Sequence, residues 1–217
     1  MRRRQFIQDM AVLGVVARGA SRAAHAADDE PTARRLPRWR GFNLQGRFGW
    51  PGRPYEGPAY EEADFAMIAE WGFEFARLPL AYWAWGSRDD WSLVREEPLA
   101  QIDRAVELGK QYGIHVDINF HRIPGYCING RELEPADLFS GRKAERDRAL
   151  AAAVFHWKTF ATRYKGIPSR RLSFDLINEP PWVKPYEGYL VEHYDEIVRA
   201  LAWMGDYLAL WKEAGWG

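Results

Sequence analysis

At 217 residues, of which 47% are hydrophobic and 28% charged, the chain has the size and composition of one ordinary globular domain. Its 30 basic and 30 acidic residues give a formal net charge of zero, so it carries no electrostatic footprint for nucleic acid. The single cysteine, Cys127, excludes an internal disulfide and a cysteine-rich metal site. No apolar run is long enough to span a bilayer, so no membrane partner is expected.

The N-terminus has the pattern of an export signal. Residues 2–4 are three arginines that lead into Gln-Phe-Ile and a short apolar stretch, and residues 24–26 (Ala-His-Ala) form an A-x-A cleavage pattern. Arg-Arg-Gln-Phe-Ile resembles a twin-arginine signal, which predicts export to the periplasm or the extracellular space. The alternative is a disordered basic tail. The expected segments are a signal at 1–26, a linker at 27–38 and a partial folded domain at 39–217.

From Trp39 onward the sequence alternates between short apolar strands and amphipathic helices. The expected strands are 39–44, 73–80, 114–121 and 172–179, and the expected helices are 60–71, 98–112, 144–165 and 187–201. Gly72 and Gly113 would end the first two helices, Pro98 would begin the second, and Pro79 would mark the exit of the second strand. Four strands that are each followed by a helix predict an α/β fold with a parallel sheet.

The first expected strand distinguishes between two α/β folds. It runs into Asn43-Leu44-Gln45-Gly46-Arg47, which lacks the glycine-rich phosphate-binding turn typical of a doubly wound sheet. The sequence therefore favours a (β/α)8 TIM barrel, of which about four βα units are present.

The stretch around which these elements are organised is residues 172–180, with the sequence L-S-F-D-L-I-N-E-P. It is apolar nearly throughout and is stopped by Pro-Pro, which is typical of a strand buried on both faces. A period of two places Asp175, Ile177 and Glu179 on one face and Asn178 on the other. An acid and an amide would then lie at the carboxyl end of a parallel strand, where α/β barrels carry their chemistry. The alternative is a simple strand-ending turn.

Polar residues also occur where the other strands are expected to end. Together the four carboxyl ends supply Asn43, Arg77, His121 and the Asn178-Glu179 pair. Taken singly, each has a structural explanation, because Arg77 could be an ion-pair partner and His121 a hydrogen-bonded core histidine. Their recurrence at four strand ends predicts a shared site.

Four stretches resemble the cellulase-like barrels of glycoside hydrolase family 5: R-G-F-N-L, F-A-R-L-P-L, N-F-H-R-I-P-G-Y and F-D-L-I-N-E-P. The resemblance covers roughly residues 40–189. It implies that Glu179 is the general acid/base and that Asn178 hydrogen-bonds the sugar hydroxyl next to the reacting carbon.

The same resemblance implies roles for four further side chains. Arg77 would position the nucleophile carboxylate, and His121 would line the subsite where cleavage occurs. Trp83 and Trp182 would stack on sugar rings, although ordinary packing of aromatic side chains is the alternative for any single ring.

Glycoside cleavage requires two carboxyl groups, about 5–5.5 Å apart for retention and about 6.5–9.5 Å for inversion, and no metal or organic cofactor. Glu179 is expected in a largely enclosed strand end, where desolvation would favour its protonated form. Asp175 lies four residues, or about 13 Å, further down the strand at roughly 3.3 Å per residue. Asp117 lies at a similar depth before His121, and we expect both to be buried groups paired with other inward side chains.

In the family the nucleophile is a glutamate at the end of the seventh strand, and the sequence offers no candidate for it. Residues 202–217 resemble the helix before the eighth strand, so we hypothesise an internal deletion near 200–205 and a premature end at Gly217. The alternative is a divergent fourth helix of a half-barrel. An incomplete barrel would have open edges, which predicts self-association.

Two functions of different class follow. The first is an exported endo-β-1,4-glucanase that acts by a retaining mechanism, with its nucleophile missing from this chain. The second is a catalytically inactive remnant that only binds carbohydrate. A barrel enzyme acting on a small substrate is a weaker third reading, because aromatic loops and export suit an extracellular polymer such as β-glucan.

Overall fold

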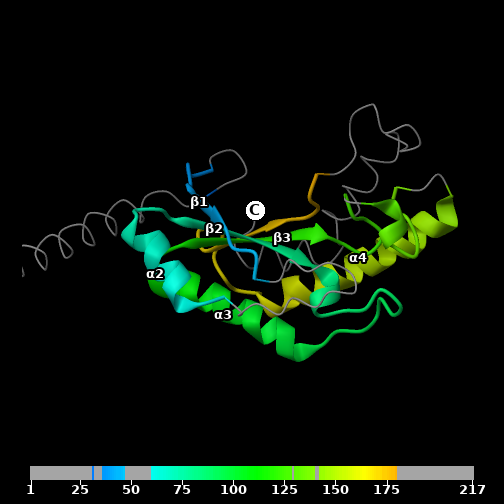
Figure 1. Cartoon of the computed structure of the whole chain (residues 1–217), viewed down its shortest axis with the longest axis horizontal. Helices are drawn as coiled ribbons and strands as arrows, with labels where there is room; N and C mark the ends of the chain where they lie inside the picture. The colour runs from blue at the N-terminus through cyan, green and yellow to red at the C-terminus, as the bar shows by residue number, and fades with distance from the viewer. Residues whose placement is uncertain (1–30, 32–35, 47–59, 129, 140–141, 180–217) are drawn as a thin grey trace, which may run out of the picture. The chain divides into compact units, whose positions relative to one another are not determined.

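The computed structural model describes residues 31, 36–46, 60–128, 130–139 and 142–179 (Figure 1). The chain divides into two units, 1–38 and 39–217, and all of the helices and strands below belong to the second. The predicted signal, the helix predicted at 187–201, the hypothesised junction near 200–205 and Trp182 lie outside the described residues. Within the described ranges, none of the helices is long and apolar enough to cross a membrane.

In chain order the elements are β1 (Gly41–Asn43), α2 (Glu62–Glu70), β2 (Phe75–Ala81), η1 (Tyr82–Ala84), α3 (Glu96–Tyr112), β3 (His115–Arg122), η2 (Arg131–Leu133), α4 (Lys143–Arg163) and β4 (Leu172–Asp175).

The four strands form one parallel sheet in the order β1-β2-β3-β4. Helix α2 connects β1 to β2, α3 connects β2 to β3, and α4 connects β3 to β4; Figure 1 shows the three helices along the same side of the sheet. Spatial order therefore equals chain order, as in a barrel, whereas a doubly wound sheet reverses its order partway. The predicted α/β class and the (β/α) barrel architecture are confirmed.

Side chains of β3 alternate between two environments. Its even-numbered residues face the helices: the ring of Phe120 stacks on Trp157 of α4 with 3.7 Å between centroids. A Cβ atom on Gly109 of α3 would lie 2.4 Å from a methyl of Val116, so the glycine lets this helix approach the strand closely. The odd-numbered residues of β3 point to the opposite, inner face of the sheet. They are His115, Asp117, Asn119 and His121.

Helix ends follow the expected signals with small differences. Gly113 caps α3 in the left-handed conformation with φ of 68°, and Gly72 follows α2 with φ of 82°. Helix α3 begins at Glu96, two residues before the predicted start at Pro98. A proline is tolerated there because the first four N–H groups of a helix have no partner within the helix.

Strand β2 includes Pro79, which was predicted to mark the exit of the strand, and it ends one residue beyond the predicted end at Leu80. Pro79 pairs with Asn119, and the strand ends at Ala81. Odd-numbered residues of β2 direct their backbone groups toward β1, as the hydrogen bond from Leu44 N to Arg77 O (2.8 Å) shows. Because β1 ends at Asn43, the missing N–H of Pro79 removes no bond of the sheet.

Strand β4 ends at Asp175, and the next residues bend away from the strand direction. The indole Nε1 of Trp157 donates to the Leu176 carbonyl at 3.0 Å, and the Asn178 N–H donates to the Phe120 carbonyl at 3.3 Å. These two bonds hold the bend against α4 and β3. The prediction that side chains keep alternating between the two faces beyond Asp175 is therefore wrong. The Asn178 side chain lies on the same face as that of Asp175.

Candidate functional site

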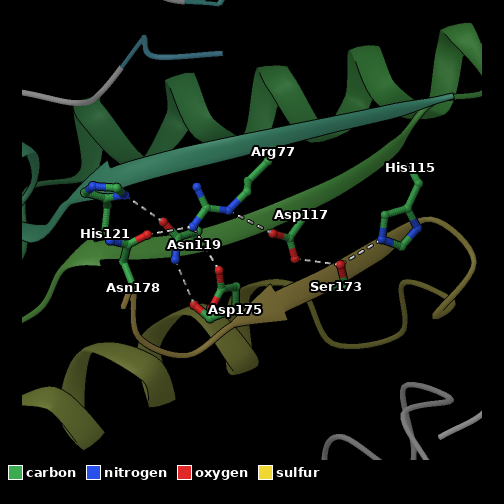
Figure 2. A network of polar contacts seen from close by, with 8 residues as sticks. All are labelled: Arg77, His115, Asp117, Asn119, His121, Ser173, Asp175 and Asn178. Carbon is green, nitrogen blue, oxygen red and sulfur yellow. Dashed lines mark hydrogen bonds and ion pairs between the residues drawn. The ribbon is translucent and has the colours of Figure 1, made fainter. Parts of the chain in front are cut away.

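Arg77 is the centre of a polar network on the inner face of the sheet (Figure 2). Its Nη2 donates to Asp175 Oδ2 at 2.9 Å and to Asn178 Oδ1 at 3.0 Å, and its Nε lies 3.8 Å from Asp117 Oδ2. Strand register explains the convergence, since Arg77 pairs with Asp117 on β3, and Asp117 pairs with Ser173 on β4. Arg77 was expected at the carboxyl end of its strand; it lies in the middle of β2, and its long side chain reaches the bend after β4.

The network extends from Asp117 toward the amino ends of the strands. The Ser173 hydroxyl donates to Asp117 Oδ1 at 2.7 Å, and His115 Nε2 lies 2.7 Å from the same hydroxyl. His115 Nδ1 lies 3.1 Å from the Arg170 carbonyl, and the ring of Trp39 stacks on the imidazole at 3.7 Å between centroids. Figure 2 shows His115 at one end of the network and His121 at the other.

Burial dominates the electrostatics of this face. It raises the pKa of Asp117 to about 6, against the Ser173 hydrogen bond and Arg77, which lower the pKa, while the Asp175 charge adds to the increase. Burial also lowers the pKa of His115 to about 4, so this imidazole is neutral at pH 7. The expectation that Asp117 and Asp175 pair with other inward side chains is confirmed, because both contact Arg77. Asp117 is buried as expected, whereas Asp175 is only half-buried, because its strand ends there.

His121 lies next to the carboxyl end of β3, at an irregularity of the sheet. Leu80 pairs with Phe120 and Ala81 pairs with Arg122, which leaves His121 as the extra residue of a β-bulge. Bulges occur frequently beside active sites, where they redirect a side chain. The bulge is thus consistent with the predicted place of His121 in the site. The role of His121 in binding substrate stays a prediction.

The protonation of His121 follows from its neighbours. Burial and, to a smaller extent, the nearby cations Arg122 and Arg77 together lower its pKa to about 4. The imidazole is therefore neutral at pH 7. Its Nδ1 lies 3.3 Å from Asn119 Oδ1, an acceptor, so Nδ1 carries the hydrogen and Nε2 is the acceptor. Asn119 in turn donates to the Asp175 carbonyl at 3.5 Å.

Asn178 has one satisfied and one unsatisfied end. Its Oδ1 accepts the bond from Arg77, which determines the orientation of the amide. Its Nδ2 is buried and has no hydrogen-bond partner among the described residues. A buried donor without a partner is unfavourable by about 1–3 kcal/mol, so this group is suited to donate to a ligand hydroxyl.

Glu179, the predicted acid, follows directly in the bend. It is exposed, which contradicts the expectation of an enclosed strand end; β4 stops four residues earlier and does not shield it. Its backbone has a φ of 45°, in the left-handed region that is uncommon for residues other than glycine. The hydroxyl of Tyr126 donates to its backbone carbonyl at 2.5 Å.

Trp83 lies on η1, directly after β2, and is half-buried. The Arg122 guanidinium lies over its ring at 5.6 Å from the centroid, and the ring of Tyr82 is 5.4 Å away. These contacts place Trp83 beside Arg122, the neighbour of His121. Stacking of Trp83 on a sugar stays a prediction, and Trp182 lies outside the described residues.

A second buried polar cluster lies in the loops that follow β2 and β3. Glu134 accepts from the Tyr82 hydroxyl at 2.8 Å and from the Gly125 N–H at 3.1 Å, and the indole of Trp91 donates to the Tyr82 oxygen at 3.0 Å. Burial raises the pKa of Glu134 to about 7. The cluster ties the loop that carries Trp83 to the loop that carries Tyr126.

Sequence reasoning missed three members of the inner-face network and the Tyr126 contact. A period of two counted back from His121 along I-H-V-D-I-N-F-H would have placed Asn119 and His115 on its face, and Ser173 shares the predicted face of Asp175. Tyr126 carries no comparable signal beyond its place after Pro-Gly. In the part of the chain that the structure describes, no group of histidine, cysteine and acidic side chains could hold a metal ion.

Comparison with known proteins gives a consistent match. The family model described as Cellulase (glycosyl hydrolase family 5) matches residues 26–206. Cellodextrinase A of Ruminococcus flavefaciens is 32% identical over 119 residues, which are 55% of this chain and 33% of that protein. The sporulation-specific glucan 1,3-beta-glucosidase of Saccharomyces cerevisiae is 38% identical over 123 residues, 56% of this chain and 27% of that protein. The matched part thus spans about a quarter to a third of the length of these curated relatives.

Solved structures show the same fold. The crystal structure of a glycoside hydrolase superposes with a TM-score of 0.65 at 34% identity and covers 76% of this chain and 49% of that one. Endoglucanase Cel5A of Thermotoga maritima, solved with cellobiose in a mutant form, superposes with a TM-score of 0.56 at 20% identity, over 76% of this chain and 46% of that one. The second likeness supports the fold alone.

Proposed function

The chain belongs to glycosyl hydrolase family 5, and from this premise we propose that it is an exported glycoside hydrolase that cleaves β-linked glucan, with Glu179 as general acid/base. Relatives named cellodextrinase, endoglucanase and glucan 1,3-beta-glucosidase support a β-glucan substrate. We propose a 1,4-linked glucan cut internally, and the twin-arginine-like N-terminus supports export.

The observation that carries this proposal is the pairing of Asn178 and Glu179 in one bend. Asn178 presents an oriented amide whose Nδ2 has no partner among the described residues, and Glu179 presents an exposed carboxyl group beside it. In the proposed reaction the amide donates to the hydroxyl next to the reacting carbon. The Glu179 carboxylic acid protonates the oxygen of the departing sugar, and its carboxylate then accepts a proton from water.

A retaining reaction also requires a nucleophilic carboxylate about 5–5.5 Å from the acid. The inner-face carboxyl groups of β3 and β4, Asp117 and Asp175, are both engaged with Arg77. Neither of these two groups is therefore a candidate nucleophile, and the absence of the nucleophile from this sequence stays a prediction. Engagement of both groups is the specific observation that favours the second candidate function, a remnant that binds carbohydrate without cleaving it.

Hydrolysis of soluble β-1,4-glucan by the full 217-residue chain separates the two functions. If the chain is an enzyme, new reducing ends appear, and Glu179→Gln lowers the rate about 10²–10⁴-fold, the usual contribution of a general acid/base. Glu107→Gln, which alters an exposed carboxylate of α3 paired with Lys110, is the matched control and should leave the rate unchanged.

Binding is measured in parallel by affinity electrophoresis in glucan-containing gels. Retardation without new reducing ends supports the binding remnant. Neither retardation nor hydrolysis contradicts both candidate functions.

A further inference from the structure

Tyr126 contacts the backbone of Glu179 but has no role in the proposed reaction. Its hydroxyl donates to the backbone carbonyl of Glu179 at 2.5 Å, across 53 residues of sequence. Tyr126 is 4% exposed, so the donor is shielded from water although Glu179 itself is exposed. The bond connects the loop after β3 to the bend after β4, next to the carboxyl group proposed to transfer the proton.

Tyr126 is itself held firmly. Ile123 and Tyr126 exchange backbone hydrogen bonds of 3.2 and 2.9 Å across Pro124-Gly125, and Gly125 has a φ of 83°, as a type II turn requires. A Cβ atom on Gly125 would lie 2.4 Å from the Cβ of Ala149, so the turn is packed against α4. The Tyr126 ring also meets Phe139 edge-on at 5.2 Å. The hydroxyl is therefore presented from a rigid support.

Glu179, in contrast, has a backbone that needs support. Its φ of 45° is a conformation that side chains with a Cβ seldom adopt, and the backbone conformation determines the direction in which the carboxyl group leaves the main chain. A donor that holds the Glu179 carbonyl therefore also holds the direction of the acid.

Asn178 is held by different groups. Its N–H donates to the Phe120 carbonyl at 3.3 Å, and its side chain accepts from Arg77 at 3.0 Å. Two consecutive residues thus depend on separate supports, so one can be released without the other.

We propose that Tyr126 is a positioning residue that holds Glu179 in its left-handed conformation and thereby aims the proton donor at the glycosidic oxygen. This inference rests on the proposed role of Glu179. A general acid must lie within hydrogen-bond reach of the atom that it protonates, and a misplacement of about 1 Å can reduce the rate about a hundredfold. Loss of the Tyr126 hydroxyl should impair protonation while the Asn178 contact to substrate persists.

The kinetic test is Tyr126→Phe in the full chain, measured on two aryl β-cellobiosides. Phenyl cellobioside has a poor leaving group that needs the acid, whereas 2,4-dinitrophenyl cellobioside departs without protonation. We expect kcat/KM, which reports the first, acid-assisted step alone, to fall about ten- to a hundredfold on the phenyl substrate and to change little on the dinitrophenyl substrate. Equal losses on both substrates, or no loss on either, would overturn the proposal.

Tyr112→Phe is the matched control, because it removes a phenol that donates to Glu62 at 2.8 Å on the exposed side of α2 and α3. It should leave both substrates unaffected.

A second readout does not depend on turnover. In the 13C,15N-labelled chain, Tyr126→Phe should shift the carbonyl and Cα resonances of Glu179 and leave the side-chain amide resonances of Asn178 in place. Unchanged Glu179 resonances would overturn the positioning role even in an active chain. If the wild-type chain produces no hydrolysis, the proposed function fails, and the Glu179 resonances still decide whether Tyr126 holds this residue.

Discussion

We expect the unfolding free energy of the wild-type chain to fall between about pH 4.5 and pH 7 because of Glu134. Replacing Glu134 with glutamine should abolish this pH dependence. The carboxyl group is buried, accepts from the Tyr82 hydroxyl and the Gly125 N–H, and its Oε1 has no partner among the described residues. Burial therefore favours the protonated acid and raises the pKa from 4.5 to about 7. The hydrogen bonds from Gly125 and Tyr82 and the charge of Arg88 oppose this increase.

The sign of the effect follows from the two states. In the folded chain Glu134 stays protonated up to about pH 7, whereas in the unfolded chain it ionises near 4.5. Between these values unfolding releases a proton, so raising the pH favours the unfolded state. At about 1.4 kcal/mol per pH unit, the free energy of unfolding falls by about 3 kcal/mol over this interval. This stability is fully present below the unfolded pKa and is lost as the pH rises through the folded pKa.

Urea unfolding followed by tryptophan fluorescence at several values between pH 4 and pH 8 measures this effect. The difference in unfolding free energy between Glu134→Gln and wild type should move by about 3 kcal/mol in favour of the variant as the pH rises. Taking the difference cancels the other titrating groups, and the neutral amide can still accept from Tyr82 and Gly125. Glu132→Gln, which removes an exposed carboxylate from the same loop, is the control and should show no such trend. A difference that stays constant from pH 4 to pH 8 would refute the reasoning.

Two further substitutions test the contacts around the bend. Arg77→Lys should lower the unfolding free energy by about 1–3 kcal/mol and weaken cello-oligosaccharide binding, because lysine lacks the fork that reaches Asp175 and Asn178 together. Urea unfolding and calorimetric titration measure the two effects, and unchanged binding would contradict the role given to Asn178. Trp157→Phe should lower the unfolding free energy by about 2–3 kcal/mol, because it removes the hydrogen bond to the Leu176 carbonyl and leaves space beside Phe120. Wild-type stability of this variant in urea would show that the bend does not depend on the indole.

The order of elements was predictable from the sequence because hydrophobic period is a local property. Apolar residues recurring at helical spacing identified α2, α3 and α4, and short apolar runs identified the strands, which together require a parallel sheet. Strand ends were less predictable, since they depend on partners. Pro79 could continue β2 because the neighbouring strand had already ended at Asn43, and nothing within residues 73–80 records where β1 stops.

The site was predictable to the extent that it lies on regular strands. Register brings Arg77 opposite Asp117, so a correct sheet order is enough to place that pair together. The arrangement of Asn178 and Glu179 was not predictable, because it arises after β4 has ended. The exposure of Glu179 and its positive φ accompany a hydrogen bond from Tyr126, 53 residues away, which no local pattern encodes.

The geometry of the amide and the acid is therefore imposed by their neighbours more than by their own strand. Asn178 is held through its backbone by β3 and through its side chain by Arg77 of β2, while Glu179 is held by the loop after β3. A bend of four residues beyond a strand has little rigidity of its own, so a reactive group placed there requires such external supports. Because each support comes from a different element, a shift of any one of them changes the relation between the Asn178 amide and the Glu179 carboxyl group. That relation is what a glycoside hydrolase must preserve, which makes the sheet register and the Tyr126 turn part of the proposed chemistry.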